Sequence, residues 1–243
     1  MRMLISDKIH PDALEFLQKK KADLLYLPEI TPLELLQKIG DVEALIVRSR
    51  TKVTKEVIEK GRSLKIIARA GSGTDNIDKT SAQAKGVAVI NAPGANAQAV
   101  AELTIGLMLS LLRQIPYANK SMHEGQWLKK ELMGAEIYNK TVGIIGFGHV
   151  GKKVTALVRA FGANTLVVGS HDEEDKLLNL LKSSDIVTLH VRLNDNTRGL
   201  INKDRLALMK PTSYLINNCR GEGVVENDLY EALVNKKIAG AAL

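Results

Sequence analysis

Three glycines in the segment GIIGFGHVGKKV have the spacing of a phosphate-binding turn. They form the pattern Gly146-x-Gly148-x-x-Gly151, between an apolar run and a helical pattern. Glycines so placed permit a tight turn, close approach of the backbone to a pyrophosphate, and close packing of the helix on the strand. The amides that open the helix then face the phosphates. The pattern indicates a dinucleotide site; the alternative is a glycine-rich turn without a ligand.

A dinucleotide site of this kind is expected to carry an acidic residue about 20 residues further on, where it binds a ribose hydroxyl. That position falls near Gly169, and the nearest acid after it is Asp172 in LVVGSHDEED. Either Asp172 turns back towards the ribose, or the site lacks the acid and Ser170 and His171 tolerate a 2′-phosphate. We expect NAD as the cofactor, with NADP as the alternative.

The elements that would position this site follow a regular order, because apolar runs alternate with helical patterns along most of the chain. Continuous apolar strands separated by helices imply parallel sheets that are covered on both faces. In the first part we expect strands at 3–6, 22–27, 44–49, 64–71 and 87–93 and helices at 11–20, 31–40, 54–61 and 76–86. In the second part we expect strands at 140–148, 164–169, 185–191, 213–218 and 238–243 and helices at 150–162, 173–184 and 226–237.

A long helical segment, 95–115, lies between the two series and is apolar on nearly every side. Such a helix is expected to be buried or to form an interface. The chain therefore divides into two α/β parts, with a boundary close to Pro93.

The composition is that of an ordinary globular protein, with 45% hydrophobic and 25% charged residues. No apolar run is long and uncharged enough to span a bilayer, and the first residues lack the apolar core of a secretion signal. The single cysteine excludes an intrachain disulfide and a cysteine-based metal cluster. We therefore expect a cytoplasmic, reducing environment, with no membrane partner and no metal.

The formal net charge of +7 raises the possibility of nucleic-acid binding. The lysines are scattered, however, and aromatic residues make up only 4% of the chain, which leaves little to stack on bases. The charge therefore favours an enzyme that acts on small anions over a nucleic-acid binder.

Taken together, several motifs resemble those of the D-isomer-specific 2-hydroxyacid dehydrogenases, and they cover nearly the whole chain. The motifs are LIVRSRTKVT (45–54), ARAGSGTDNID (68–78), NAPGANAQAVAELTIGLML (91–109), GIIGFGHVG (143–151), NNCRGEGVVENDLYEAL (217–233) and AGAAL (239–243). The resemblance implies an α/β fold of two doubly wound parallel-sheet domains, with the reaction in the cleft between them. Residues 1–93 would form a flavodoxin-like substrate-binding domain, and residues 94–243 a Rossmann-like NAD-binding domain.

The resemblance also implies roles for residues that would bind a small anionic substrate. Arg220 would be the catalytic arginine, since a planar fork of donors can hold a carboxylate and polarise the C2 oxygen. The backbone around Ser72 and Gly73 would receive the carboxylate, and Arg48 would bind a distal phosphate. Arg50 is a weaker candidate, with a solvated surface arginine as the alternative, and we interpret Arg69 as structural.

On the cofactor side, the resemblance extends beyond the three glycines. His149 would contact the pyrophosphate weakly, because it stands where the family usually has arginine. The full set of implied cofactor contacts is Gly146, Gly148, His149, Val150 and Gly151 at the pyrophosphate, Val191 near the adenosine, and Asn218, Cys219 and Arg220 near the nicotinamide ribose.

Two departures from the family pattern stand out. The family's acid–base histidine and its glutamate partner lie after the AGAAL strand, and none of the five histidines here replaces them by position. We therefore expect a chain of these 243 residues alone to have little or no dehydrogenase activity. In addition, the family usually has a longer segment with one more short strand between LVVGS and EEDKLLNLL.

The expected function is NAD-dependent oxidation of a D-2-hydroxy acid. The motifs are most similar to the branch of the family that oxidises 3-phosphoglycerate to 3-phosphohydroxypyruvate, which opens serine biosynthesis. The alternatives within the family are glyoxylate/hydroxypyruvate reductase and D-lactate dehydrogenase. Those of another class are a nucleotide-sensing, corepressor-like binding protein and an inactive fragment. We also expect a homodimer that forms through the nucleotide-binding domain, with Trp127 either as an interface anchor or as a core or lid aromatic.

Overall fold

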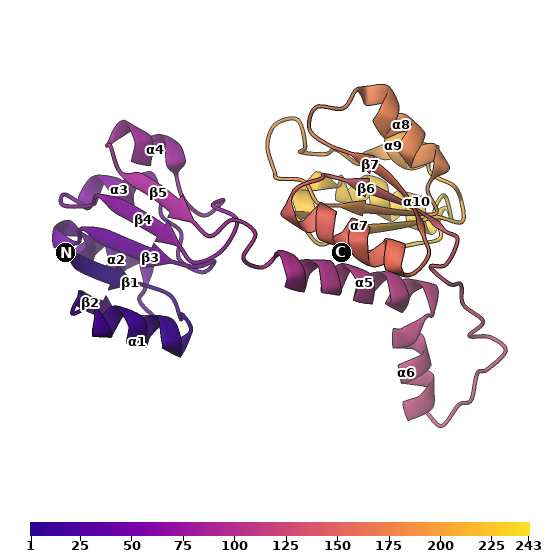
Figure 1. Ribbon diagram of the computed structural model, residues 1–243, viewed down its shortest axis with the longest axis horizontal. Helices are drawn as coiled ribbons and strands as arrows, with labels where there is room; N and C mark the ends of the chain where they lie inside the picture. Colours follow the sequence, from indigo (N-terminus) through magenta and orange to yellow (C-terminus); the bar gives the residue numbers. More distant parts are fainter. The chain divides into compact units, whose positions relative to one another are not determined.

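The computed structural model describes residues 1–243, which divide into two compact units, Met1–Asn96 and Ala97–Leu243 (Figure 1). Each unit contains one five-stranded sheet in which every strand pair is parallel. The predicted α/β class with two parallel sheets is therefore confirmed. The division falls a little beyond the predicted boundary at 93, in the loop between β5 (Ala88–Asn91) and α5 (Ala97–Leu112).

The first unit has the strand order β2-β1-β3-β4-β5, which is the flavodoxin-like order. Its elements lie close to the predicted ones; the first strand is shifted by one residue, and the other four strands are shorter than predicted. The other strands are β1 (Arg2–Ile5), β2 (Asp23–Tyr26), β3 (Ala44–Val47) and β4 (Ile66–Arg69). The helices are α1 (Pro11–Lys19), α2 (Pro32–Lys38), α3 (Lys55–Lys60) and α4 (Lys79–Ala84), and a 3-10 turn, η1, covers Ile39–Asp41.

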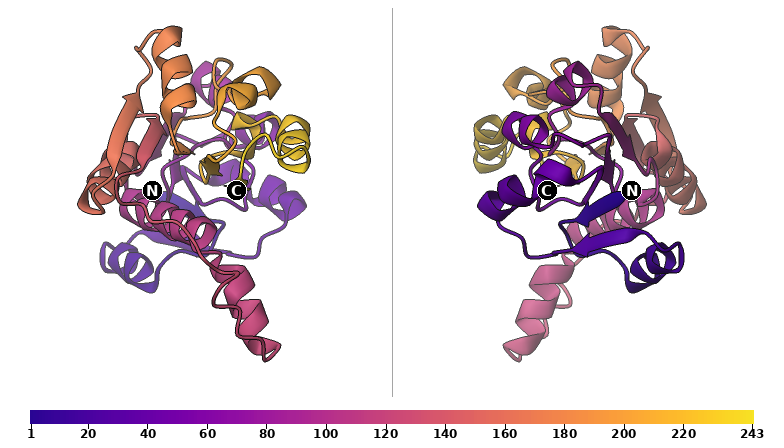
Figure 2. Two further views of the ribbon diagram at one scale, coloured as in Figure 1. Left: turned by 90° about the vertical axis from the view of Figure 1, so that its right-hand side faces the viewer. Right: turned by 90° about the vertical axis from the view of Figure 1, so that its left-hand side faces the viewer.

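Helices cover the two faces of this first sheet unequally. On one face, Leu45 and Ile67 pack in a fully buried core with residues of α2, α3 and α4. On the other face lies α1 (Figure 2), which has no fully buried residue, and Ile46 of that face is only half-buried. The helices begin where their sequences predict, as in α2, where Thr31 and Glu34 form a reciprocal capping box.

The second unit has the order β10-β9-β8-β6-β7. Its strands are β6 (Thr141–Ile145), β7 (Asn164–Val168), β8 (Ile186–Leu189), β9 (Tyr214–Asn217) and β10 (Gly240–Ala242). The Rossmann order is 3-2-1-4-5-6, and removal of its third strand leaves the order seen here. The short connection after β7 thus leaves that strand at the edge of the sheet.

Two layers of helices enclose the second sheet (Figure 1). α5 and α7 (His149–Ala160) pack on one face, where Met108 and Val154 meet Ile144 and Ile216 in a common core. The other face carries α8 (Glu174–Ser183), α9 (Lys203–Leu208) and α10 (Glu226–Val234) around a second core. A 3-10 turn, η2 (Gly221–Gly223), follows β9.

The helix expected over 95–115 is wrong in one respect, because it ends at Leu112 and a second helix, α6 (Ile115–His123), begins soon after it. Gln114 has a left-handed backbone, with φ of 50°, and Pro116 lies in the first turn of α6. Both features interrupt a continuous helix. The sequence patterns also missed α9, which is short and capped by Asn202.

α6 and the segment that follows it project from the second sheet (Figures 1 and 2). No single helix has the length and apolar character needed to cross a membrane. α5 and α6 meet those two criteria only as a pair, and the two helices are bent by 63° relative to each other.

Candidate functional site

The loop after β6 lies where the strand order of the second sheet reverses. β6 pairs with β7 on one side and with β8 on the other, and ligands of open α/β sheets bind outside such a point. Gly146 has φ of +102°, and a Cβ atom there would lie 2.5 Å from the carbonyl oxygen of His190. Only glycine fits this place, so the loop packs directly on the segment that follows β8.

Gly151 and Gly148 meet two different requirements at the start of α7. A Cβ atom on Gly151 would lie 2.0 Å from the carbonyl oxygen of Gly146, so the helix could not approach the loop with any larger residue. A Cβ atom on Gly148 would meet nothing within 4 Å, which is the open space that a pyrophosphate needs. Gly148 is the N-cap, and no side chain bonds the helix amides there. These residues fit a bound dinucleotide.

His149 and Val150 begin α7, which starts one residue before the predicted helix, and they differ in exposure. His149 is exposed at the helix N-terminus, where it can meet an anion, whereas Val150 is half-buried and packs against the core between α5 and α7. Lys152 lies near them, with its ammonium 5.7 Å from the centre of the Phe147 ring. The loop therefore presents the Lys152 ammonium at its rim as well as amides.

The Asp172 side chain turns back to the end of β7. Its Oδ2 accepts a 2.7 Å hydrogen bond from the amide of Gly169, and its Oδ1 lies 2.6 Å from the ammonium of Lys176. The bond from Gly169, and then that from Lys176, lower the pKa of the Asp172 carboxyl. An ionised carboxylate thus stands where the ribose acid is expected.

Arg220 follows β9, at the same edge of the sheet as the glycine loop. Its backbone is fixed by the buried side chain of Asn217, whose Nδ2 donates to the carbonyl oxygen of Arg220 at 2.8 Å. The Asn217 Oδ1 accepts from the amide of Cys219 at 3.2 Å. Beyond the arginine, the amide of Gly199 donates to the carbonyl oxygen of Glu222 at 2.7 Å. Hydrogen bonds therefore hold both ends of the loop 218–222, here called the arginine loop.

Cys219 and Val191, both predicted near the cofactor, lie next to each other at this edge. Burial raises the pKa of the Cys219 thiol, while hydrogen bonds from the Arg220 and Val191 backbone oppose the rise. Its Sγ also lies 3.0 Å from Asn217 Oδ1. The cysteine is thus a mostly protonated, packed thiol rather than a nucleophile.

Asn218 has a structural contact that the sequence did not suggest. Its Nδ2 donates to the carbonyl oxygen of Val100 at 3.2 Å and to Thr104 Oγ1 at 2.8 Å, both on α5. The Oδ1 of Asn218 is buried without a partner. The side chain therefore ties the arginine loop to α5 and keeps one acceptor unused.

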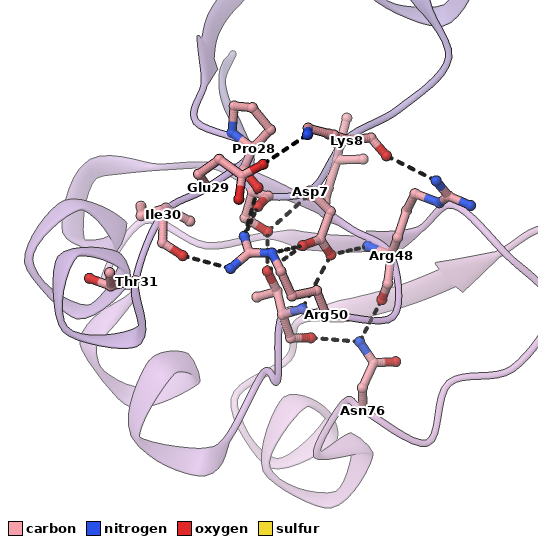
Figure 3. Close-up of polar contacts among 12 residues, drawn as sticks. Asp7, Lys8, Pro28, Glu29, Ile30, Thr31, Arg48, Arg50 and Asn76 are labelled. Atoms are coloured by element: carbon pink, nitrogen blue, oxygen red, sulfur yellow. Dashed lines mark hydrogen bonds and ion pairs between the residues drawn. The ribbon is translucent and has the colours of Figure 1, made fainter.

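In the first unit, Arg48 and Arg50 differ sharply, as Figure 3 shows. The Arg50 guanidinium donates to the carbonyl oxygens of Ile30, Ser6 and Pro28, and its Nε lies 3.1 Å from the buried Asp7 carboxylate. Its role is to join three segments. The exposed Arg48 guanidinium donates to the Lys8 carbonyl oxygen at 3.2 Å, and its backbone is held by Asp7 and Asn76.

The loop that holds Ser72 and Gly73 follows β4, next to the end of β3 where Arg48 lies. The amides of Ala70 and Gly71 donate to backbone carbonyls, so the Ser72 and Gly73 amides are the ones available to a ligand. The Ser72 hydroxyl donates to Asn96 Oδ1 at 2.6 Å, which fixes the loop. In this unit the structure thus brings Arg48 close to the predicted carboxylate loop.

Arg69 is a candidate that sequence reasoning set aside as structural. A Cβ atom on Gly71 would lie 1.9 Å from Arg69 Nη1, so the guanidinium covers the loop itself, and its buried Nε has no partner. The signal that could have found it is its place immediately before the small residues of the loop.

The histidines do not form an acid–base pair in this chain. His10 has a carboxylate nearby, since its Nδ1 lies 3.5 Å from Asp12, but both side chains are exposed at the start of α1. His190 is half-buried immediately after β8, where burial of its ring lowers its pKa to about 4, and the ring contacts Thr188. It is therefore a neutral imidazole at neutral pH.

Fold and site together define an α/β nucleotide-binding protein with an arginine held at the same sheet edge as the phosphate loop. The family described as D-isomer specific 2-hydroxyacid dehydrogenase, NAD binding domain, matches residues 105–243. The chain belongs to the D-isomer-specific 2-hydroxyacid dehydrogenase family.

Similar proteins support the same membership. A D-3-phosphoglycerate dehydrogenase of Methanocaldococcus jannaschii is 43% identical over all of this chain and 48% of its own length. A hydroxypyruvate reductase of Thermotoga maritima is 41% identical over all of this chain and 81% of its own length. An acyclic imino acid reductase solved with NADPH and D-Arg has 29% identity and a TM-score of 0.90, and the match covers 99% of this chain and 80% of that one.

The chain spans about half the length of the relatives named D-3-phosphoglycerate dehydrogenase. Those relatives therefore contain regions with no counterpart in these 243 residues.

Proposed function

We propose that the protein is an NAD-dependent D-2-hydroxyacid dehydrogenase whose substrate is 3-phosphoglycerate, which it oxidises to 3-phosphohydroxypyruvate in serine biosynthesis. The observation that carries the proposal is the position of Arg220. It follows β9 at the carboxyl edge of the sheet, and the glycine loop follows β6 at the same edge, with β8 alone between the two strands. This arrangement supports hydride transfer between a nicotinamide and a carboxylate-bearing substrate.

Bound NAD would supply the hydride acceptor, and this chain's residues would orient the substrate. The Arg220 guanidinium would hold the substrate carboxylate with paired hydrogen bonds and stabilise negative charge on the C2 oxygen. The Asn217 bond would hold the backbone of Arg220, and the guanidinium is oriented by the 2.7 Å hydrogen bond that its Nη1 donates to the Cys219 carbonyl oxygen. Loss of this preorganised cation typically costs about a hundredfold or more in kcat.

The first unit supports a phosphorylated substrate. Arg48 is exposed at the end of β3, and the Arg69 guanidinium covers the neighbouring loop at Gly71. Two guanidinium groups beside amides that can receive a carboxylate suit a substrate with two anionic ends. Arg50 contributes to the fold instead, because its donors are engaged with backbone carbonyls and Asp7.

Hydroxypyruvate reduction is the second candidate, because the Thermotoga maritima relative is 41% identical and this chain covers 81% of it. The chemistry at C2 would be the same in both cases. The substrates differ at the distal end, where hydroxypyruvate has a hydroxyl and 3-phosphohydroxypyruvate a phosphate. Arg48 is therefore the residue that separates the two candidates.

A comparison of kcat/KM for 3-phosphohydroxypyruvate, hydroxypyruvate and pyruvate, with NADH, tests the proposal in the protein that carries this chain. We expect kcat/KM for the phosphorylated substrate to be at least about tenfold higher than for the other two, and Arg48→Gln to abolish that difference. Arg62→Gln, at an exposed arginine of the same unit, is the matched control and should leave it intact. Equal values for the phosphorylated and unphosphorylated substrates would favour the second candidate, and activity with pyruvate alone would point to D-lactate.

We also propose that the protein is a cytoplasmic homodimer that forms through the second unit. On the projecting segment, Trp127 is 75% exposed and Met133 is 85% exposed, which supports a surface that another copy covers. Sedimentation at micromolar concentration should show the dimer, and Trp127→Glu should shift it to monomer. A wild-type monomer under these conditions would contradict the dimer.

A further inference from the structure

The outer edge of β7 has no neighbouring strand in this chain. β7 pairs with β6 on one side and ends the sheet on the other. The edge is open because the short connection 169–173 leads from β7 directly to α8, without the third strand of the Rossmann order. Such an edge offers its backbone groups to a strand from another chain.

Hydrogen bonds to β6 identify which backbone groups of β7 face outward. The amide of Asn164 donates to the carbonyl oxygen of Lys140 at 2.8 Å, and the carbonyl oxygen of Val168 accepts a 2.7 Å bond from the amide that follows β6. Backbone groups alternate in direction along a strand, so Asn164 and Val168 face β6, as does the residue midway between them. The N–H and C=O groups of Thr165 and Val167 therefore face away from the sheet.

The chain itself closes this outward row at both ends. The amide of Ala163 donates to a carbonyl oxygen of α7 at 3.2 Å, and the amide of Gly169 donates to Asp172 Oδ2 at 2.7 Å. Between them, the backbone groups of Thr165 and Val167 have no partner in this chain. Two donors and two acceptors are thus left for a short added strand.

β7 has none of the features that usually block pairing at an edge. Its sequence, NTLVV, contains no charge and no proline, and its register with β6 has no bulge. Its central residues are half-buried, with Leu166 packed against the core that includes α8 and Val167 against the core that includes α7. An added strand would therefore extend two apolar layers as well as the hydrogen bonds.

One guanidinium group sets the charge of this edge on the α7 side. Arg159 of α7 is exposed, and its Nε and Nη2 donate to Thr165 Oγ1 at 3.1 and 2.9 Å. It forms no ion pair within the chain. A carboxylate on an added strand, on the same face as Thr165, would supply the missing anion.

A second copy of this chain fits the edge less well than an acidic strand does. Two β7 edges related by a two-fold axis would bring two Arg159 groups to one face of the joined sheet, where like charges repel. We propose that the outer edge of β7 binds an extended segment of a partner protein by strand addition, with carboxylates on alternate residues of the segment facing Arg159. The backbone of Thr165 and Val167 holds the segment, and Arg159 selects an acidic one.

Two labelled peptides of alternating sequence, EVEVEVE and KVKVKVK, test the charge preference by fluorescence anisotropy in the protein that carries this chain. The glutamate peptide should bind at least about tenfold more tightly than the lysine peptide. Arg159→Gln should reduce that preference about three- to tenfold. Lys153→Gln is the matched control, because Lys153 lies on the α5 side of α7, with its Nζ 3.1 Å from Gln98 Oε1, and it should leave the preference intact.

N-methylation of the glutamate peptide tests the strand pairing itself. Only alternate amides of an added strand face β7, so one peptide is methylated on all valine amides and a second on all glutamate amides. The two peptides should differ in affinity by at least about tenfold, since one of them loses its hydrogen bonds to the edge.

On the protein, Val167→Pro removes an outward donor and leaves the bonds to β6 in place, because proline is tolerated on edge strands. It should bind the glutamate peptide at least about tenfold more weakly, with the fold checked by urea unfolding. Equal affinity of the two methylated peptides, or an unchanged charge preference in Arg159→Gln, would overturn the proposal. A dimer of Trp127→Glu that Val167→Pro dissociates would also overturn it and would assign the edge to a second copy.

Discussion

The side-chain amide of Asn217 donates a 2.8 Å hydrogen bond to the carbonyl oxygen of Arg220. Asn217 is the last residue of β9 and is 4% exposed, so its position is set by the sheet and its core. This hydrogen bond therefore holds the loop that carries Arg220 against the end of the strand. A site residue placed on a loop gains precision from such a support.

Replacement of Asn217 should therefore impair catalysis without loss of the cofactor site. In Asn217→Ala we expect kcat to fall about 10- to 100-fold and KM to change much less, because a misplaced guanidinium still attracts the carboxylate. Steady-state kinetics, with ADP affinity as a second readout, checks this. Asn235→Ala is the control, since Asn235 makes a similar 2.8 Å bond to a backbone carbonyl on the exposed side of α10. An unchanged kcat in Asn217→Ala would show that the clamp is dispensable.

Gly148→Ala should weaken cofactor binding and leave the fold stable, whereas Gly151→Ala should lower the stability of the fold. Gly148 has φ of −82° and open space around its Cβ position, so its alanine variant should fold normally and bind NADH at least about tenfold more weakly. Gly151→Ala would force a methyl group to 2.0 Å from a backbone oxygen, and should cost about 1–3 kcal/mol of stability. Urea unfolding and NADH fluorescence titration separate the effects. Normal NADH affinity in Gly148→Ala would argue against a pyrophosphate at this loop.

Asp172 should set the choice between NAD and NADP. Its pKa is lowered by the Gly169 and Lys176 contacts, so the carboxylate stays ionised well below neutral pH and repels a 2′-phosphate. In Asp172→Asn, Lys176 remains to attract that phosphate, and we expect the ratio of NADPH to NADH affinity to rise about tenfold or more. Glu173→Gln is the neighbouring control. A ratio that does not move would mean that the ribose lies away from Asp172.

His190 should make the second unit less stable in mild acid. Its pKa falls from 6.5 to about 4 on burial, so the unfolded chain takes up a proton first as the pH drops. Stability is then complete above about pH 6.5 and is lost progressively down to about pH 4, by roughly 3 kcal/mol. Urea unfolding across this pH range should show a smaller loss in His190→Gln than in wild type. A loss of equal size in both would place its origin elsewhere.

Much of the fold could be predicted because its signals are local. The alternation of apolar runs and helical patterns located all ten strands, and the glycine spacing located the start of α7. The break between α5 and α6 was missed because the apolar pattern runs on through Leu112. The break is caused by Pro116 and by the left-handed backbone conformation of Gln114. A glutamine in the sequence does not indicate that conformation.

The site was harder to predict, because its determinants are contacts between distant segments. The sequence separates Arg48 from Arg50 only through the resemblance to the family, whereas the structure shows that the Arg50 guanidinium is engaged by carbonyls of the β2–α2 connection. Arg69 was set aside because its strand position suggests packing, whereas its guanidinium covers the loop at Gly71.

The most direct measurement of the central claim compares wild type with Arg220→Lys in the protein that carries this chain. NADH affinity and kcat/KM for 3-phosphohydroxypyruvate are determined for both. Lysine keeps the charge and loses the planar fork, so kcat/KM should fall by about a hundredfold or more while NADH binds as before. A variant that turns over substrate like wild type would contradict the role given to Arg220.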